Sequence, residues 1–118
     1  MAKAAIIVLA GTDGGENLGR LANALEAAKE FVETDGDEVD VVFDGAAAQW
    51  IPELEDEAHD YHDAYRAVHD EIAVCEYCSK AFGVEDAVLD AGVTVLSEYE
   101  GHPSIRSMVA DDYEIITF

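Results

Sequence analysis

Residues 4–10 read AAIIVLA, and the five residues that follow them read GTDGG. A continuous apolar run that ends in a glycine-rich turn is typical of a strand that is buried on both faces of a parallel sheet. Beyond the turn, apolar residues recur at helical spacing from Leu18 to Val32 and stop at the polar turn TDGD of residues 34–37. The start of the chain therefore predicts a strand, a loop and an amphipathic helix, in that order.

Four further segments have the composition of short strands. Each is rich in apolar and β-branched residues and is bounded by Gly, Asp or other turn residues. They are residues 39–43, 72–74, 93–97 and 113–117. Five strands that alternate with helices predict an α/β fold, a three-layer α/β/α sandwich with a five-stranded, mostly parallel sheet. The length of 118 residues fits one domain, residues 1–118.

The stretches between these strands have helical patterns. Apolar residues spaced by three and four predict one long helix from Leu54 to about residue 70, with Pro52 breaking the short turn before it. Residues 79–92 predict helical turns that Gly83 interrupts. The last helix is expected to contain Pro103 in its first turn, where proline is tolerated.

The charge balance and the hydropathy pattern limit the possible functions. The chain has six Lys and Arg residues and 27 Asp and Glu residues, so its formal net charge is −21. Direct nucleic-acid binding is excluded, because phosphates would be repelled. No apolar run approaches the roughly 20 residues that span a bilayer, and no export signal is visible, so we expect a cytoplasmic protein with no membrane contact. Acidic residues spread along the whole chain indicate adaptation to a high-salt cytoplasm, in which charge repulsion is screened.

The carboxyl edge of the predicted sheet is where the binding crevice of an α/β protein forms. Three loops follow strands at that edge: residues 11–15, Asp44-Gly45 and residues 75–78. A fourth loop, before the last helix, carries a histidine that can act as a proton donor near neutral pH. The residues expected to line the crevice are Thr12, Asp13, Gly14, Asp44 and His102.

Nucleotide binding and serine catalysis find little support in these loops. Residues 11–16 lack both the Gly-Lys-Ser/Thr ending of a P-loop and the G-x-G-x-x-G pattern, and Asp13 and Glu16 would repel a phosphate. No serine lies in a G-x-S-x-G turn. The sequence therefore predicts no cofactor.

Cys75 and Cys78 form a C-x-x-C pair where a strand leads into a helix. A helix N-terminus lowers the pKa of a thiol and favours the thiolate that performs sulfur transfer. Glu76 and the negative net charge act in the opposite direction, so the sign of the net pKa shift stays open. A structural disulfide is disfavoured in an unexported protein, whereas a thioredoxin-like redox role and packing as inert thiols remain alternatives.

Zinc binding is a further alternative for the same cysteines. His59 and His62 form an H-x-x-H pair, and together with Cys75 and Cys78 they supply four ligands of the kind zinc takes. The return of the chain through the following strand would place this pair at the far end of the domain, which favours solvated histidines. The sequence therefore assigns no metal ligand, and zinc stays open.

The segment IAVCEYCSKAFGV, residues 72–84, resembles the DsrE/DsrF-like family. In that family the strand ends in a cysteine that is followed eight positions later by a glycine and an aliphatic residue, here Cys75, Gly83 and Val84. The order of elements agrees over nearly the whole chain, and the C-x-x-C variant is similar to the YchN-like branch.

The resemblance implies a DsrE-like fold and a small cytoplasmic protein that forms a homotrimer, a homohexamer or a heteromeric ring. It implies that the strand-end cysteine, Cys75, carries a persulfide from a sulfur donor to an acceptor protein, in tRNA thiolation or sulfur metabolism. Cys78 is then a resolving thiol that can release the sulfur by forming a disulfide. The alternative is a non-catalytic oligomeric binding module whose C-x-x-C is structural, redox-active or zinc-binding.

Aromatic and apolar residues near Pro52 give a separate indication of oligomerisation. Four of them exceed what one helix needs to cover a sheet, namely Trp50, Ile51, Tyr61 and Tyr65. Ordinary core packing explains them equally well.

Overall fold

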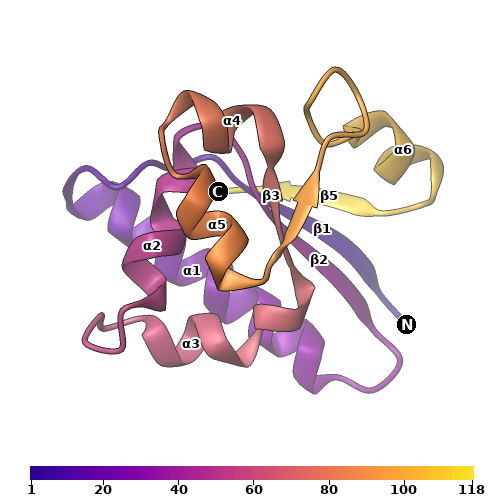
Figure 1. The fold of residues 1–118 in the computed structure, drawn as a ribbon. Helices are drawn as coiled ribbons and strands as arrows, with labels where there is room; N and C mark the ends of the chain where they lie inside the picture. Colours follow the sequence, from indigo (N-terminus) through magenta and orange to yellow (C-terminus); the bar gives the residue numbers. More distant parts are fainter.

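The computed structural model describes residues 1–118 as a five-stranded sheet flanked by helices (Figure 1). The strand order is β4-β3-β2-β1-β5, and every neighbouring pair is parallel. The predicted α/β class is confirmed, and the sheet is parallel throughout. The strands are β1 (Lys3–Val8), β2 (Glu38–Phe43), β3 (Ile72–Cys75), β4 (Thr94–Leu96) and β5 (Glu114–Thr117).

Six α-helices and two 3-10 helices connect the strands. None of the helices is both long and apolar enough to cross a membrane. They are α1 (Gly14–Glu33), η1 (Gly45–Gln49), α2 (Trp50–Glu55), α3 (His62–Ala67), η2 (His69–Glu71), α4 (Glu76–Ala81), α5 (Glu85–Ala91) and α6 (Ile105–Ala110).

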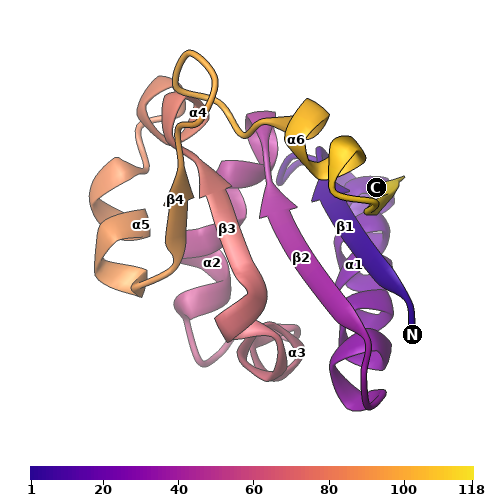
Figure 2. The same cartoon turned by 90° about the vertical axis from the view of Figure 1, so that its right-hand side faces the viewer.

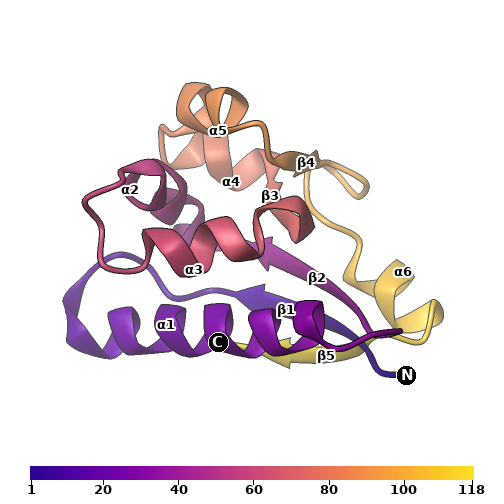
Figure 3. The ribbon, with the colours of Figure 1, turned by 90° about the horizontal axis from the view of Figure 1, so that it is seen from below.

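The two faces of the sheet are covered unequally. Alternate strand residues such as Ile6 and Val41 point into a large core that includes buried residues of α1 to α5. On the opposite face, Met108 of α6 packs with Ile7 and Val42 in a much smaller cluster. Figure 2 views the sheet from the α6 side, with α1, α2 and α3 behind it, and Figure 3 shows the layers from below. The helices nevertheless form layers on both faces, as the three-layer prediction requires.

The prediction of one long helix from Leu54 to about residue 70 is wrong. The chain instead forms α2 and α3, separated by a turn at residues 56–61. The Asp56 carboxylate accepts a hydrogen bond from the Ala58 backbone N–H at 2.9 Å, and such local bonds compete with the helical ladder. The apolar residues keep a spacing of three and four across the turn. The reason is that both helices bury apolar residues, Leu54 and Tyr65, in the same core.

The two prolines also lie elsewhere than predicted. Pro52 does not break a turn but lies in the first turn of α2. Proline is tolerated there, because backbone N–H groups of the first turn do not donate hydrogen bonds within the helix. Pro103 precedes the last helix, whose N-cap is Ser104. The Ser104 hydroxyl accepts a hydrogen bond from the Ser107 N–H at 3.1 Å, so the cap fixes the start of α6 at Ile105, two residues after the proline.

The aromatic residues near Pro52 belong mainly to the protomer's own core. Trp50, Ile51 and Tyr65 are buried within the single chain, and the Trp50 indole N–H donates to the Ala10 carbonyl at 2.8 Å. Tyr61 is half-buried against the same core. These residues therefore give no support to an oligomer, and core packing explains them.

Candidate functional site

Four reactive or charged side chains meet at the carboxyl edge of β2 and β3. Asp44 directly follows β2, Cys75 ends β3, Cys78 lies in the first turn of α4, and His102 lies in the loop between β4 and α6. One ligand atom of each side chain lies within 4.8 Å of the others. We call this group the thiol cluster. Parallel strands end at one edge of the sheet, which explains how residues far apart in the sequence come together.

The position of Cys75 follows from the direct junction of β3 and α4. Cys75 is the N-cap of α4, with extended backbone angles, and its Sγ accepts a hydrogen bond from the Cys78 N–H at 3.4 Å. The Cys75 side chain is 0% exposed, and Cys78 is 9% exposed. Both thiols are free, so the pair can act as two thiols.

A tight turn holds His102 beside Cys75. Tyr99 and His102 exchange backbone hydrogen bonds of 2.9 and 2.8 Å, and Gly101 between them has φ +84°, which favours glycine. The Gly101 carbonyl accepts from the Tyr77 N–H at 2.9 Å, which fastens the turn to α4. As a result His102 Nδ1 lies 3.3 Å from Cys75 Sγ.

Two hydrogen bonds hold the Asp44 carboxylate in the thiol cluster. Its Oδ1 accepts a hydrogen bond from the Gly45 N–H at 2.8 Å, which caps η1. The Cys78 thiol donates to the same oxygen at 3.5 Å. Each cysteine therefore has its own polar partner, Cys75 with His102 and Cys78 with Asp44.

The electrostatic environment keeps Cys75 protonated in the resting protein. Burial is the main cause that raises the pKa of Cys75, from 9.0 to about 12. The hydrogen bond from the Cys78 N–H lowers this pKa, whereas the Cys78 side chain and the Asp44 charge raise it further. The sequence left the sign of the shift open, and in the structure burial outweighs the helix N-terminus. Cys75 therefore needs a base to become a nucleophile near neutral pH.

The other three expected pocket residues follow β1 at the same edge of the sheet. Thr12 and Asp13 lie in the loop between β1 and α1, and Gly14 is the first residue of α1. Strand β2 separates β1 from β3 in the sheet. Asp13 is the N-cap of α1, and its carbonyl accepts a hydrogen bond from the Asn17 side chain at 3.0 Å.

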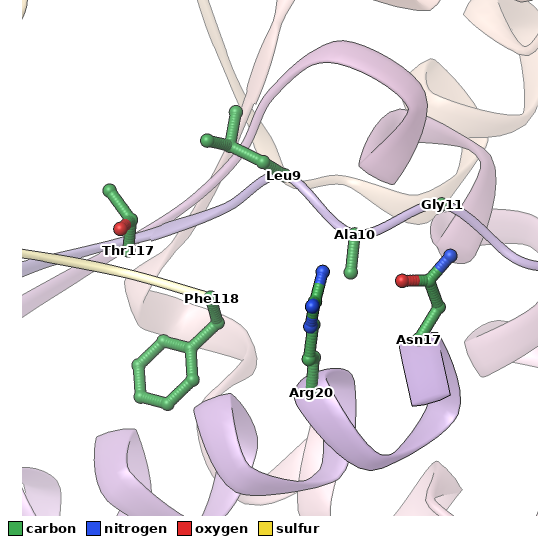
Figure 4. Close-up of a pocket in the computed structure, with 7 residues that line it drawn as sticks. All are labelled: Leu9, Ala10, Gly11, Asn17, Arg20, Thr117 and Phe118. Carbon is green, nitrogen blue, oxygen red and sulfur yellow. The ribbon is translucent and has the colours of Figure 1, made fainter. Parts of the chain in front are cut away.

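A cavity lies at the carboxyl ends of β1 and β5, beside α1. It encloses about 540 Å³, and Figure 4 shows Asn17 and Arg20 of α1 directed toward the residues that follow β1. Arg20 is already paired with Glu16 at 2.7 Å. The lining residues are Leu9, Ala10, Gly11, Asn17, Arg20, Thr117 and Phe118. This cavity contains no thiol and is separate from the thiol cluster.

The zinc set of His59, His62, Cys75 and Cys78 does not assemble. His59 Nδ1 accepts a hydrogen bond from the Tyr61 N–H, and His62 Nδ1 lies 2.7 Å from the Leu54 carbonyl oxygen. Figure 1 shows α3 and α4 at opposite ends of the molecule. The two histidines thus bond locally, and the side chains beside the cysteines are those of Asp44 and His102.

Tyr77 is a neighbour of the site that sequence reasoning missed. Its ring lies against the His102 ring, with centroids 4.7 Å apart and planes tilted by 36°, and 57% of it is exposed. Its place inside the C-x-x-C segment is the signal that could have identified it. Tyr77 therefore forms part of the exposed surface beside His102.

Comparison with known proteins shows the family to which this chain belongs. A sequence model of the DsrE/DsrF-like family matches residues 2–118. The uncharacterized protein MJ0733 of Methanocaldococcus jannaschii is 29% identical over 100 residues, which cover 85% of this chain and 81% of that protein. A solved structure, the conserved protein of unknown function BT1422 from Bacteroides thetaiotaomicron, shares the fold with a TM-score of 0.61 and 13% identity, over 97% of this chain and 94% of that chain. Because the family match spans nearly all of the sequence, the chain belongs to the DsrE/DsrF-like family.

Proposed function

We propose that this protein is a cytoplasmic sulfur carrier that accepts sulfur as a persulfide on Cys75 and passes it to a partner protein. The observation that carries the proposal is the 3.3 Å separation of Cys75 Sγ and His102 Nδ1 at the carboxyl edge of the sheet. Membership in a family with a sulfur-relay-type fold supports the same chemistry. A buried thiol beside an imidazole is an activated-nucleophile arrangement.

Sulfur acceptance begins with a donor persulfide, R–S–SH. The Cys75 sulfur attacks the outer sulfur atom, the donor S–S bond breaks, and His102 takes the Cys75 proton as the new S–S bond forms. The proton passes to the donor thiolate, so that the products are Cys75–S–SH and R–SH. His102 is required in this step because burial raises the pKa of the Cys75 thiol to about 12.

Sulfur can leave Cys75 by two reactions. An acceptor thiol can attack the outer sulfur, which regenerates the Cys75 thiol and leaves the persulfide on the acceptor. Cys78 can instead attack the inner sulfur, which gives a Cys75–Cys78 disulfide and hydrogen sulfide, and a dithiol reductant then restores both thiols. Asp44 serves as the acceptor for the Cys78 proton in the second route, because its Oδ1 lies 3.5 Å from the Cys78 sulfur.

Partners of the carrier are a sulfur donor protein, an acceptor protein and further subunits of a trimer, hexamer or heteromeric ring. The exposed rings of Tyr77 and Tyr99, 57% and 65% accessible, flank His102 and provide contact area for a docking protein. The negative charge of the chain favours a basic partner surface.

Intact mass under non-reducing conditions tests the proposal. Metal-free protein is incubated with a cysteine desulfurase and cysteine, and we expect a gain of about 32 Da that reduction removes. The gain should disappear in Cys75→Ser and persist in Cys78→Ser. No gain in Cys78→Ser, in which release through Cys78 is closed, would refute the proposal. Labelling lost in Cys78→Ser and kept in Cys75→Ser would reverse the roles of the two cysteines.

A non-catalytic binding module is the second candidate. The observation that favours it is the complete burial of Cys75, because thiols buried in apolar surroundings are inert. In such a module neither cysteine would take up sulfur, and the mass experiment separates the two functions.

A further inference from the structure

We propose that the thiol cluster, Asp44, Cys75, Cys78 and His102, binds one Zn²⁺ ion in tetrahedral coordination. The inference goes beyond sulfur transfer, because it assigns a metal site to residues that the carrier mechanism uses as thiols, base and acceptor. It also replaces the donor set suggested by the sequence, since His59 and His62 are absent from the cluster.

The chemical composition of the cluster favours zinc among the common divalent cations. Two thiols, one imidazole and one carboxylate are all ligand types of Zn²⁺, whereas Mg²⁺ and Ca²⁺ take oxygen ligands. The four groups come from the end of β2, the end of β3, the first turn of α4 and the loop before α6. A surface cluster of carboxylates would not discriminate in this way.

The distances within the cluster match a tetrahedron around zinc. Bonds of about 2.3 Å to sulfur and about 2.0 Å to nitrogen or oxygen place a sulfur and a neighbouring N or O donor about 3.5 Å apart. The observed separations are 3.3 Å from Cys75 Sγ to His102 Nδ1 and 3.5 Å from Cys78 Sγ to Asp44 Oδ1. All four atoms lie within 4.8 Å of one another. Two of the donor pairs therefore already have the spacing that a tetrahedral zinc ion requires.

Neighbouring groups already orient three of the four ligands. The Gly45 N–H holds Asp44 Oδ1 at 2.8 Å, the Cys78 N–H points to Cys75 Sγ at 3.4 Å, and the Tyr77 ring supports the His102 ring. Such outer contacts fix ligand orientation and raise metal affinity. The Cys78 backbone N–H also remains a favourable donor to Cys75 Sγ once that sulfur is a thiolate.

Zinc binding replaces the two thiol protons, which pass to solvent, and involves no oxidation. Two thiolates and a carboxylate leave a metal site with a net charge of about −1. Because Zn²⁺ and a persulfide both require Cys75 Sγ, the two occupancies exclude each other. This exclusion rests on the proposed sulfur-carrier function, whereas the metal site itself does not.

Cobalt(II) titration of the metal-stripped, reduced protein tests the site, because Co²⁺ substitutes for Zn²⁺ and its absorption reports thiolate bonds. The titration is done in molar KCl, which screens the acidic surface. We expect a thiolate-to-cobalt charge-transfer band that saturates at one equivalent per chain and is removed by one equivalent of Zn²⁺. Asp44→Ala and His102→Ala should each weaken Zn²⁺ binding by more than about tenfold, while the matched controls Asp13→Ala and His59→Ala bind as the wild type does.

Two results would overturn the zinc site. One is no charge-transfer band in the wild-type protein at one equivalent, a measurement that needs no variant to fold. The other is an unchanged spectrum and affinity in Asp44→Ala and His102→Ala, which would mean that the thiols bind metal with other donors. Sulfur loading is measured separately in a chelator, so failure of the carrier function and failure of the zinc site give different results. If both hold, one equivalent of Zn²⁺ should abolish the mass gain on Cys75.

Discussion

Cys75 and Cys78 share one short segment but differ in their surroundings. Cys75 is fully buried and faces His102, whereas Cys78 is slightly accessible and faces the Asp44 carboxylate. Burial disfavours the thiolate of Cys75, so its reactivity depends on the neighbouring imidazole. At the scale of single residues, the site is therefore a thiol and a base that act as a pair, with a second thiol nearby.

The alkylation rate of Cys75 should keep rising at alkaline pH. In metal-free Cys78→Ser, Cys75 is the single thiol, and burial, the main cause that raises the pKa of Cys75, remains. Since the rate follows the thiolate fraction, we expect about a tenfold increase per pH unit from pH 8 to pH 11, with no plateau near 9. Mass-monitored reaction with iodoacetamide in molar KCl checks this. A plateau below pH 9 would contradict the burial argument.

Removing the base should slow sulfur acceptance. In His102→Ala the Cys75 proton loses its acceptor, and we expect the initial rate of persulfide formation at pH 7 to fall by about a hundredfold. Part of this rate should return near pH 10, where more thiolate forms without a base. The control His59→Ala should load at the wild-type rate. A rate in His102→Ala equal to that of the wild type would remove His102 from the mechanism.

At the element scale, β3 and α4 form the functional unit, because no loop separates them and Cys75 belongs to both. The loop from β4 to α6 then brings His102 over this junction, anchored by Ser104 at the start of α6. A change at this cap acts on the helix and leaves the thiols untouched.

Loss of the α6 cap should lower stability modestly. In Ser104→Ala the Ser107 N–H loses its side-chain acceptor, and we expect the free energy of unfolding to fall by about 1 kcal/mol. Urea denaturation in constant molar KCl measures the change. The exposed Ser97→Ala should change it by less than about 0.5 kcal/mol. Equal effects for the two variants would show that the cap contributes nothing.

Sequence patterns predicted the strands well and the helices less well. Buried strands such as residues 4–10 carry continuous apolar runs, and the rule that strand ends share one edge placed Asp44 and Cys75 on the same side of the sheet. The break between α2 and α3 was missed, because it depends on Asp56 bonding to the backbone. The strand order, with β2 between β1 and β3, was not predicted, because it is not encoded in local patterns.

At the scale of the whole molecule, 118 residues carry a formal net charge of −21. The few cations are mostly paired at the surface, as in the contact of Lys3 with Asp111 at 3.1 Å, and exposed pairs contribute little. Repulsion among the remaining carboxylates opposes folding in dilute buffer.

Salt should therefore stabilise the protein strongly. We expect the melting temperature to rise continuously from dilute buffer to molar KCl, because the Debye length falls to about 3 Å at 1 M. Circular dichroism melts in KCl check this, and a neutral osmolyte of equal osmolality serves as the control. A melting temperature that does not change with KCl would contradict the halophilic interpretation.

The two outer strands of the sheet limit how copies of the chain can associate. β4 has three residues and β5 has four, so a strand from another copy would find few free backbone groups to pair with. Short edges are one way in which proteins prevent sheet-to-sheet extension. We therefore expect any assembly to be built from side chains of helices and loops, and not by extension of the sheet from one copy to the next.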